Sequence, residues 1–262
     1  MQRSLGIIGS GAWGSALAIS LSEKFDIIYL IAQDDAEVKS LSTQHAALNT
    51  PFNNNISITA DLSNITAVEA ILIATPSYAF NEILSKLGHY VSDQQFIAWA
   101  TKGFDTPNSC FLHETFESAL PTHAACVISG PTFAMEIAKK KPSAIVVASK
   151  DSETREYWAD AIQTKTLRAY TSEDVIGVEV GGSVKNILAI AAGVANGLGL
   201  GANTQAAIIT RGLAEMTRLG MALGADKSTL QGLSGMGDLV LTCSDDLSRN
   251  RRFGKELAKN IT

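Results

Sequence analysis

Short apolar runs rich in β-branched residues alternate with stretches of helical spacing through the first two thirds of the chain. This alternation is typical of a parallel sheet with helices on both faces, so an α/β fold is predicted. After about Thr171 the strand pattern stops, and the segments that begin at Ser183, Thr204, Asp226 and Arg252 have helical spacing. The predicted strands are 5–8, 27–31, 71–74, 96–100, 126–129 and 145–148, and the predicted helices between them are 13–23, 78–87, 110–119, 133–139 and 153–163.

The first strand runs into Gly9-Ser10-Gly11-Ala12-Trp13-Gly14 and then into a helix. In a dinucleotide site Gly9 makes the tight turn, Gly11 lets the backbone approach a pyrophosphate, and Gly14 lets the helix pack closely on the strand. The free N–H groups at the helix start would then hold the diphosphate. A Rossmann-type, mostly parallel sheet over residues 1–175 is therefore predicted, followed by a mostly helical second domain over 176–262, with a cleft between them.

Composition narrows the class of protein. With 262 residues, 46% of them hydrophobic, the chain can bury a large core, and its net charge of −5 argues against a nucleic-acid or anionic-membrane surface. Its three cysteines are far apart and lack metal or disulfide spacing, and the chain opens without a signal-like leader, so a cytoplasmic protein is expected. The stretch from Asn186 to Arg211 carries no charge, but polar residues and glycines interrupt it, so no membrane insertion is expected.

The second strand ends at Gln33-Asp34-Asp35, about 20 residues after the last glycine of the turn, where a side chain normally meets the adenosine ribose. Gln33 or Asp34 can fill this role. Alternatively, Asp34 and Asp35 only cap the following helix. An acid here would repel the 2′-phosphate of NADP, and no arginine is present to attract it.

Two further loops open at the same edge of the sheet, because ligands of parallel sheets lie at the carboxyl ends of the strands. Lys102 follows one strand. Either its positive charge points toward the cofactor or toward an anionic substrate, or it is an ordinary solvated lysine. Gly130-Pro131-Thr132 forms another junction between strand and helix, where Pro131 suits a helix start and Thr132 offers a hydroxyl.

Lys185 stands out because its helical neighbours at three and four positions carry no carboxylate. A lysine in this setting either extends to water or is desolvated with a lowered pKa, the state that a general base requires.

Nearer the end of the chain, Asp238 follows a glycine-dense turn, and Ser248-Arg249-Asn250-Arg251-Arg252 is a dense basic cluster. The cluster is either a phosphate clamp or a solvated run of charge. The four histidines lack the spacing of a metal site, so no metal is expected.

Taken together and in this order, these segments resemble the bacterial NAD(P)-dependent sn-glycerol-3-phosphate dehydrogenases over nearly the whole chain. The segments that carry the resemblance are 9–14, 101–103, 130–136, 184–186, 197–203, 235–239 and 248–254. The resemblance implies reversible oxidation of sn-glycerol 3-phosphate to dihydroxyacetone phosphate with NAD(P)(H), supply of glycerophospholipid synthesis, a Rossmann domain followed by a helical domain, and a homodimer.

The resemblance also implies roles for individual residues. Lys185 is the implied proton acceptor, and Arg249 and Asn250 are suited to hold the substrate phosphate. The implied substrate site comprises Lys102, Gly130, Thr132, Lys185, Asp238, Ser248, Arg249 and Asn250. The implied cofactor site comprises Gly9, Gly11, Ala12, Trp13, Gly14, Gln33, Lys102, Ala134 and Arg249, with Gly130 also near it.

The chain departs from the family pattern at two places. Many relatives carry arginine or histidine near Gln33, so a preference for NADP is in doubt, and family members normally continue beyond Thr262 with further helices. Two alternatives stay open: a hydroxy-acid dehydrogenase, because Gly181-Gly182-Ser183-Val184-Lys185-Asn186 resembles the lysine-bearing helix of those enzymes, and a non-catalytic NAD(H)-sensing module.

Overall fold

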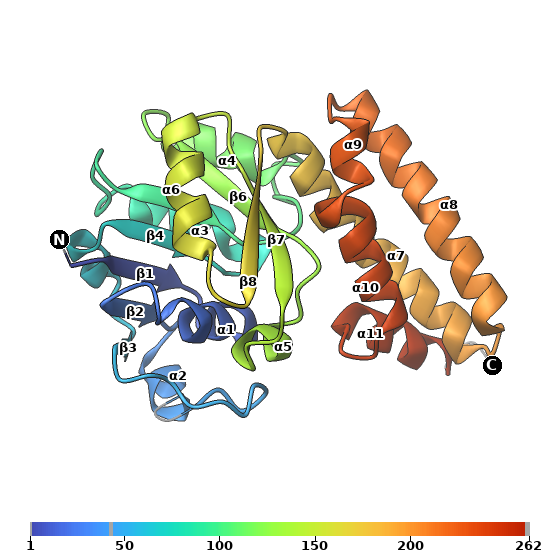
Figure 1. Ribbon diagram of the computed structural model, residues 1–262, viewed down its shortest axis with the longest axis horizontal. Coiled ribbons are helices and arrows are strands. Elements are labelled where there is room, and N and C mark those ends of the chain that lie inside the picture. The colour runs from blue at the N-terminus through green and yellow to red at the C-terminus, as the bar shows by residue number, and fades with distance from the viewer. Residues whose placement is uncertain (1, 42–43, 260–262) are drawn as a thin grey trace.

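An eight-stranded sheet forms the centre of the N-terminal part of the molecule (Figure 1). The computed structural model describes residues 2–41 and 44–259. The strand order is β3-β2-β1-β4-β5-β6-β7-β8, and neighbouring strands are parallel except β6 and β7. The strands are β1 (Ser4–Ile8), β2 (Ile27–Ile31), β3 (Ile56–Thr59), β4 (Ala70–Ile73), β5 (Phe96–Trp99), β6 (Ala125–Ser129), β7 (Ser143–Ala148) and β8 (Leu167–Ser172).

The predicted fold class is confirmed, and the six predicted strands lie within one or two residues of β1, β2, β4, β5, β6 and β7. The two edge strands, β3 and β8, were missed. An edge strand has a neighbour on one side only, so its sequence need not be a continuous apolar run. In β8 only Leu167 is buried, and the rest of the strand reads Arg-Ala-Tyr-Thr-Ser.

Helices cover both faces of the sheet. On one face α1, α5 and α6 bury Leu17, Ile137 and Trp158 against the strands. On the other face α3 and α4 bury Phe80 and Phe116. The helices of this part are α1 (Ala12–Leu21), α2 (Asp35–Ser40), η1 (Leu62–Ala67), α3 (Ser77–Leu87), α4 (Leu112–Ala119), α5 (Ala134–Ala138) and α6 (Ser152–Ile162).

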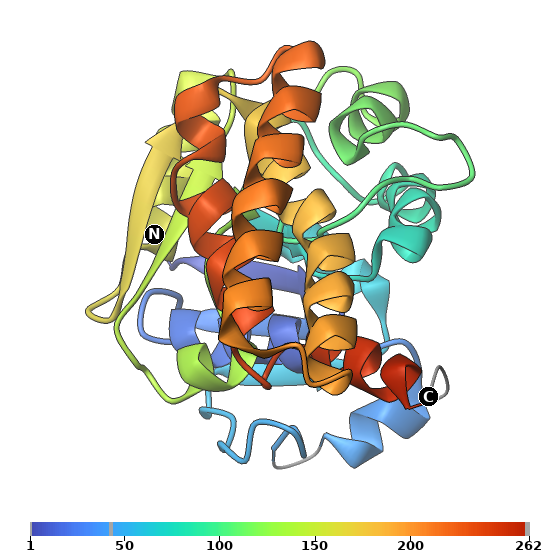
Figure 2. The same ribbon diagram turned by 90° about the vertical axis from the view of Figure 1, so that its right-hand side faces the viewer.

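The rest of the described chain is helical and lies beside the sheet (Figures 1 and 2). Its longest helix, α7, packs against α8, α10 and α11. The approach of α11 is close, since a Cβ at Gly193 would lie 2.1 Å from the Arg251 carbonyl oxygen. These elements are α7 (Val175–Gly197), α8 (Gly201–Ala222), α9 (Lys227–Leu230), η2 (Leu233–Gly237), α10 (Asp238–Ser244) and α11 (Arg249–Ala258), and the last three residues of the predicted second domain lie outside the described chain.

Helix α7 begins eight residues before the predicted start at Ser183. Its first turn is capped by Asp174, whose carboxylate accepts a 2.7 Å hydrogen bond from the Gly177 N–H. Three glycines in the N-terminal half obscured this helix, because glycine has a low helix propensity. Packing requires one of them here, since a Cβ at Gly181 would lie 2.4 Å from the Ser234 carbonyl oxygen.

Helix α7 is also the one helix in the described part of the chain that is long and apolar enough to span a membrane. However, 61% of its most apolar window is buried inside the protein. Its apolar character is therefore explained by its position as the packed core of the helical part.

Candidate active site

The glycine-rich turn between β1 and α1 has the geometry that a dinucleotide requires. Gly9 adopts a φ of +109°, and a Cβ there would lie 2.9 Å from the Ala74 backbone. A Cβ at Gly14 would lie 1.9 Å from the Gly9 carbonyl oxygen. By contrast, Gly11 is exposed and a Cβ there would meet nothing within 4 Å, so its backbone stays open to a ligand. The turn thus fits a pyrophosphate in the way that its sequence predicts.

The start of α1 adds donors to this turn. Ala12 and Trp13 form the first residues of the helix, and no side chain caps the helix at Gly11. The buried indole Nε1 of Trp13 and the buried hydroxyls of Ser10 and Thr75 also have no hydrogen-bond partner within the described chain. Unpaired donors at a helix N-terminus favour an anionic ligand.

At the end of β2, Asp34 caps α2 through a 2.8 Å hydrogen bond from the Glu37 N–H to its Oδ1 atom. The Glu37 side chain in turn accepts a 2.8 Å hydrogen bond from the Gln33 N–H. This confirms capping by Asp34, whereas Asp35 belongs to the first turn of α2. The Gln33 side chain is exposed beside these carboxylates.

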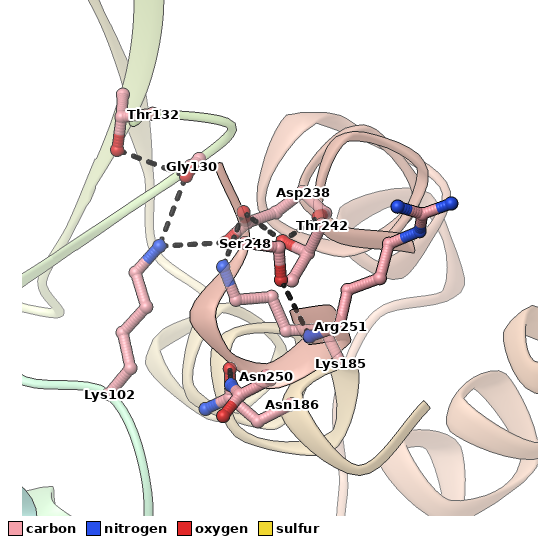
Figure 3. Close-up of polar contacts among 10 residues, drawn as sticks. All are labelled: Lys102, Gly130, Thr132, Lys185, Asn186, Asp238, Thr242, Ser248, Asn250 and Arg251. Carbon is pink, nitrogen blue, oxygen red and sulfur yellow. Dashed lines mark hydrogen bonds and ion pairs between the residues drawn. The ribbon is translucent and has the colours of Figure 1, made fainter. Parts of the chain in front are cut away.

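Three charged side chains meet where the sheet contacts the helical part of the molecule: Lys102, Lys185 and Asp238 (Figure 3). Lys102 comes from the loop after β5, Lys185 from α7 and Asp238 from the start of α10. The Lys185 Nζ atom lies 2.5 Å from Asp238 Oδ1, and the Lys102 Nζ atom lies 2.7 Å from Asp238 Oδ2. One fully buried carboxylate therefore holds two lysines that point toward each other.

The Lys185 side chain is only 8% exposed. Of the two alternatives for this lysine, extension to water or desolvation, the structure therefore shows desolvation. Burial, and next the positive charge of Lys102, lower the pKa of Lys185 to about 7, although the Asp238 carboxylate opposes this shift. A lysine with this pKa can accept or donate a proton at neutral pH.

If Lys185 is the proton acceptor, as the family resemblance implies, this pKa predicts a pH dependence of opposite sign in the oxidation of the alcohol and the reduction of the ketone. A base must be neutral, so the rate of alcohol oxidation should rise as the pH increases through about 7. An acid must be protonated, so the rate of ketone reduction should fall through the same pH range. Steady-state rates in both directions across neutral pH test this, and limbs of the same sign would contradict it.

The junction after β6 lies beside Lys102. The Gly130 carbonyl oxygen accepts hydrogen bonds from Lys102 Nζ at 3.1 Å and from the Thr132 hydroxyl at 3.3 Å. Ala134 begins α5, so Pro131 lies before the helix and not at its start as the sequence suggested. The predicted helix 133–139 nevertheless agrees with α5 to within one residue at each end.

The basic cluster forms the first turn of α11. Ser248 caps this helix by accepting a 3.2 Å hydrogen bond from the Arg251 N–H, and the Asn250 amide donates to Asn186 Oδ1 at 2.8 Å. Arg251 is buried and paired with Asp246, whereas Arg249 is exposed and has no ion-pair partner within the described chain. Cations at the positive end of a helix are unfavourable alone, so this arrangement favours a bound anion.

Two site residues escaped the sequence analysis. The Thr242 hydroxyl donates to the Asp238 carbonyl oxygen at 2.7 Å and lies 3.4 Å from Asp238 Oδ1. Its spacing of four residues from Asp238 on one helix was the available signal. Asn186, next to Lys185, connects the lysine helix to α11, a contact that no local pattern indicates.

Comparisons with known proteins identify the family of this chain. Residues 4–155 match the family model of the NAD-dependent glycerol-3-phosphate dehydrogenase N-terminus, and residues 174–262 match that of its C-terminus. The chain belongs to this family. The resemblance, the Rossmann-type domain and the class of NAD(P)-dependent dehydrogenase are thereby confirmed, and the hydroxy-acid dehydrogenase and sensor alternatives are not favoured.

Relatives of the family are similar over nearly the whole chain. The glycerol-3-phosphate dehydrogenase [NAD(P)+] of Ruthia magnifica is 62% identical, with 99% of this chain and 80% of the relative aligned. That of Hydrogenovibrio crunogenus is 46% identical, with 98% and 77% aligned. The crystal structure of glycerol-3-phosphate dehydrogenase from Coxiella burnetii has a TM-score of 0.93 at 40% identity, with 99% of this chain and 84% of that chain aligned.

Proposed function

We propose that this family member interconverts sn-glycerol 3-phosphate and dihydroxyacetone phosphate by hydride transfer to or from NAD(P). The observation that carries the proposal is the buried Lys185, whose pKa of about 7 suits proton exchange and which Asp238 holds opposite Lys102. The dinucleotide turn and the basic start of α11 supply the two further requirements, a cofactor site and a phosphate site.

In oxidation, neutral Lys185 accepts the proton of the C2 hydroxyl as the hydride leaves C2. In reduction, the Lys185 ammonium polarises the C2 carbonyl and then gives its proton to the oxygen. The bound nicotinamide cofactor supplies the hydride acceptor or donor. Asp238 keeps Lys185 in place during both directions, and Lys102 keeps the local charge positive, which favours a neutral Lys185.

The substrate phosphate belongs, in this proposal, at the first turn of α11. Arg249 provides an unpaired guanidinium, and Ser248 and Asn250 provide polar groups beside it. On the sheet side of the proposed substrate site, the Gly130 carbonyl oxygen accepts hydrogen bonds from Lys102 and from Thr132. Arginine binds phosphate through two parallel hydrogen bonds, which also orients the C2 atom toward Lys185.

For the cofactor, we propose that Gly9, Gly11, Ala12, Trp13 and Gly14 hold the pyrophosphate. Gln33 is assigned to the adenosine ribose, and Lys102, Ala134 and Arg249 to other parts of the cofactor. The open backbone at Gly11 and the uncapped start of α1 support the first assignment.

The assay that tests this function follows the absorbance of the reduced cofactor at 340 nm when dihydroxyacetone phosphate is added, with NADH and NADPH in separate reactions. We expect turnover, and we expect kcat/KM to be about tenfold higher with NADH, because Asp34, Asp35 and Glu37 repel a 2′-phosphate. Equal rates would remove the carboxylates from cofactor choice. Absence of turnover with either cofactor, while both still bind, would exclude this substrate.

We further propose that residues 1–175 form the cofactor domain and residues 176–262 the substrate domain of a cytoplasmic homodimer that supplies glycerophospholipid synthesis. Light scattering after size-exclusion chromatography tests the dimer directly, and a monomer mass at assay concentration would contradict it.

A further inference from the structure

A buried carboxylate that the proposed reaction does not use joins the lysine-bearing helix to the sheet domain. Glu179 lies on α7, six residues before Lys185, and its side chain is 2% exposed. Its Oε2 atom lies 2.5 Å from His113 Nδ1, and its Oε1 atom accepts a 3.1 Å hydrogen bond from the His113 N–H. Both carboxylate oxygens thus bind one residue of α4.

The contact also gives a hydrogen-bond partner to a backbone N–H group at the start of α4. His113 lies in the first turn of α4, where backbone N–H groups have no partner within the helix. Glu114 closes that turn from inside by accepting a 2.7 Å hydrogen bond from the Phe111 N–H. The His113 N–H is instead satisfied from the other domain, so the start of α4 is complete only when α7 is in place.

Burial and the contact between Glu179 and His113 shift the pKa of each side chain in opposite directions. Burial raises the pKa of Glu179, although the hydrogen bonds and charge of His113 oppose this shift. Burial alone would lower the pKa of His113, but the hydrogen bond and charge of Glu179 outweigh it and raise that pKa. The contact between the two side chains therefore opposes the effect of burial on each of them, and neither side chain is isolated in the interior.

A second contact ties the same half of α7 to the loop that carries Lys102. The Ser183 hydroxyl donates a 3.0 Å hydrogen bond to the Gly103 carbonyl oxygen. Ser183 lies two residues before Lys185, and Gly103 directly follows Lys102. Between the two contacts, a Cβ at Gly182 would lie 2.9 Å from Ser129 Oγ and 3.6 Å from Lys102 Cγ, so the helix and the sheet edge are in close contact here.

We infer that Glu179 is a positioning residue for the proposed reaction: through His113 it fixes α7 against α4, so that Lys185 reaches Asp238 opposite Lys102. Glu179 and Lys185 are about 9 Å apart along the helix axis, less than two turns. A helix moves as a rigid element over this length, so a shift at Glu179 displaces the Lys185 amine relative to Lys102. The inference rests on the proposed function only for its kinetic consequence.

The test compares Glu179→Ala with Glu179→Gln. Glutamine can still accept the His113 N–H and donate to a neutral His113 ring, so it preserves the contact without the charge. A misplacement of about 1 Å costs roughly 100-fold in rate, so the alanine variant should lose about 10-fold to 100-fold in kcat. Its KM for NADH should stay unchanged, because the dinucleotide turn lies elsewhere. The glutamine variant should recover most of the lost kcat.

Asp151→Ala is the matched control. Asp151 also satisfies a helix start, through a 2.7 Å hydrogen bond from the Thr154 N–H in α6, but none of its hydrogen bonds in the described chain connects it to α7. This variant should lose stability and keep kcat. Wild-type kcat in Glu179→Ala, equal loss in Glu179→Gln, or the same loss in Asp151→Ala would each overturn the inference.

Hydrogen exchange separates this inference from the proposed function. In Glu179→Ala the amides of residues 175–186 should exchange faster, while those of α1 keep their wild-type protection. This readout needs no turnover. An inactive wild-type enzyme would contradict the proposed function, whereas unchanged exchange in the alanine variant would contradict the positioning role.

Discussion

Replacing Lys185 by methionine is expected to lower kcat by about 1,000-fold in both directions, while NADH binding stays close to that of the wild type. Methionine fills a similar volume but can neither accept nor donate the proton at C2. The Lys185 amine is buried and bound to Asp238, and the other side chains at that carboxylate are Lys102, on the opposite oxygen, and the Thr242 hydroxyl, which is no base at neutral pH. Bulk water cannot replace a base in so buried a place.

Two measurements are needed, a steady-state rate at 340 nm and a fluorescence titration of NADH. Lys86→Met serves as the control, because Lys86 is an exposed lysine that pairs with Glu82 on α3. The control should retain full rate and full binding. Unchanged turnover in Lys185→Met would remove Lys185 from the mechanism, and loss of NADH binding would mean that its main role is to shape the cofactor site.

Much of the fold follows from local pattern alone. Strands buried on both faces, such as β1 and β4, are continuous apolar runs, and the glycine turn after β1 is formed by neighbouring residues. The edge strands β3 and β8 were missed because partial exposure permits polar residues in them. The early start of α7 was missed because its glycines serve contacts with distant segments.

The candidate site likewise contains a part formed by neighbouring residues and a part formed by residues far apart in the sequence. The roles of Gly9, Gly11 and Gly14 depend on a single turn, so their spacing was informative. Asp238, however, lies 136 residues from Lys102 and 53 residues from Lys185. No spacing rule brings these three residues together, and the lowered pKa of Lys185 arises from burial and from Lys102. Their association could be suggested beforehand only by the family resemblance.

In the basic cluster too, the sequence does not show which side chains are available to a ligand, although the cluster is only five residues long. Its sequence offers three equivalent arginines, whereas the structure pairs the buried Arg251 with Asp246 and leaves Arg249 and Arg252 exposed. Which arginine is available to a ligand depends on the phase of α11 relative to α7, and this phase is set by the packing of Gly193 and Gly254.

Replacing Arg249 by alanine is expected to raise KM for dihydroxyacetone phosphate by about 10-fold to 100-fold, with a smaller change in kcat. A hydrogen bond to a charged group contributes about 1.5–3 kcal/mol, which corresponds to this range of binding constants. In the proposed complex the guanidinium binds a part of the substrate that does not react, so its loss weakens the ground state and the transition state alike. A KM effect is therefore the expected signature.

The decisive comparison uses dihydroxyacetone, which has the reacting carbonyl but no phosphate. For this analogue kcat/KM should fall much less in Arg249→Ala, because the analogue has no phosphate for the guanidinium to bind and only the proposed contact of Arg249 with the cofactor is lost. Arg211→Ala is the control: Arg211 is an exposed arginine of α8 paired with Glu215, and its loss should affect neither substrate. Equal losses for both substrates in Arg249→Ala would show that Arg249 acts on the cofactor or the fold, and the phosphate would then need another partner at the start of α11.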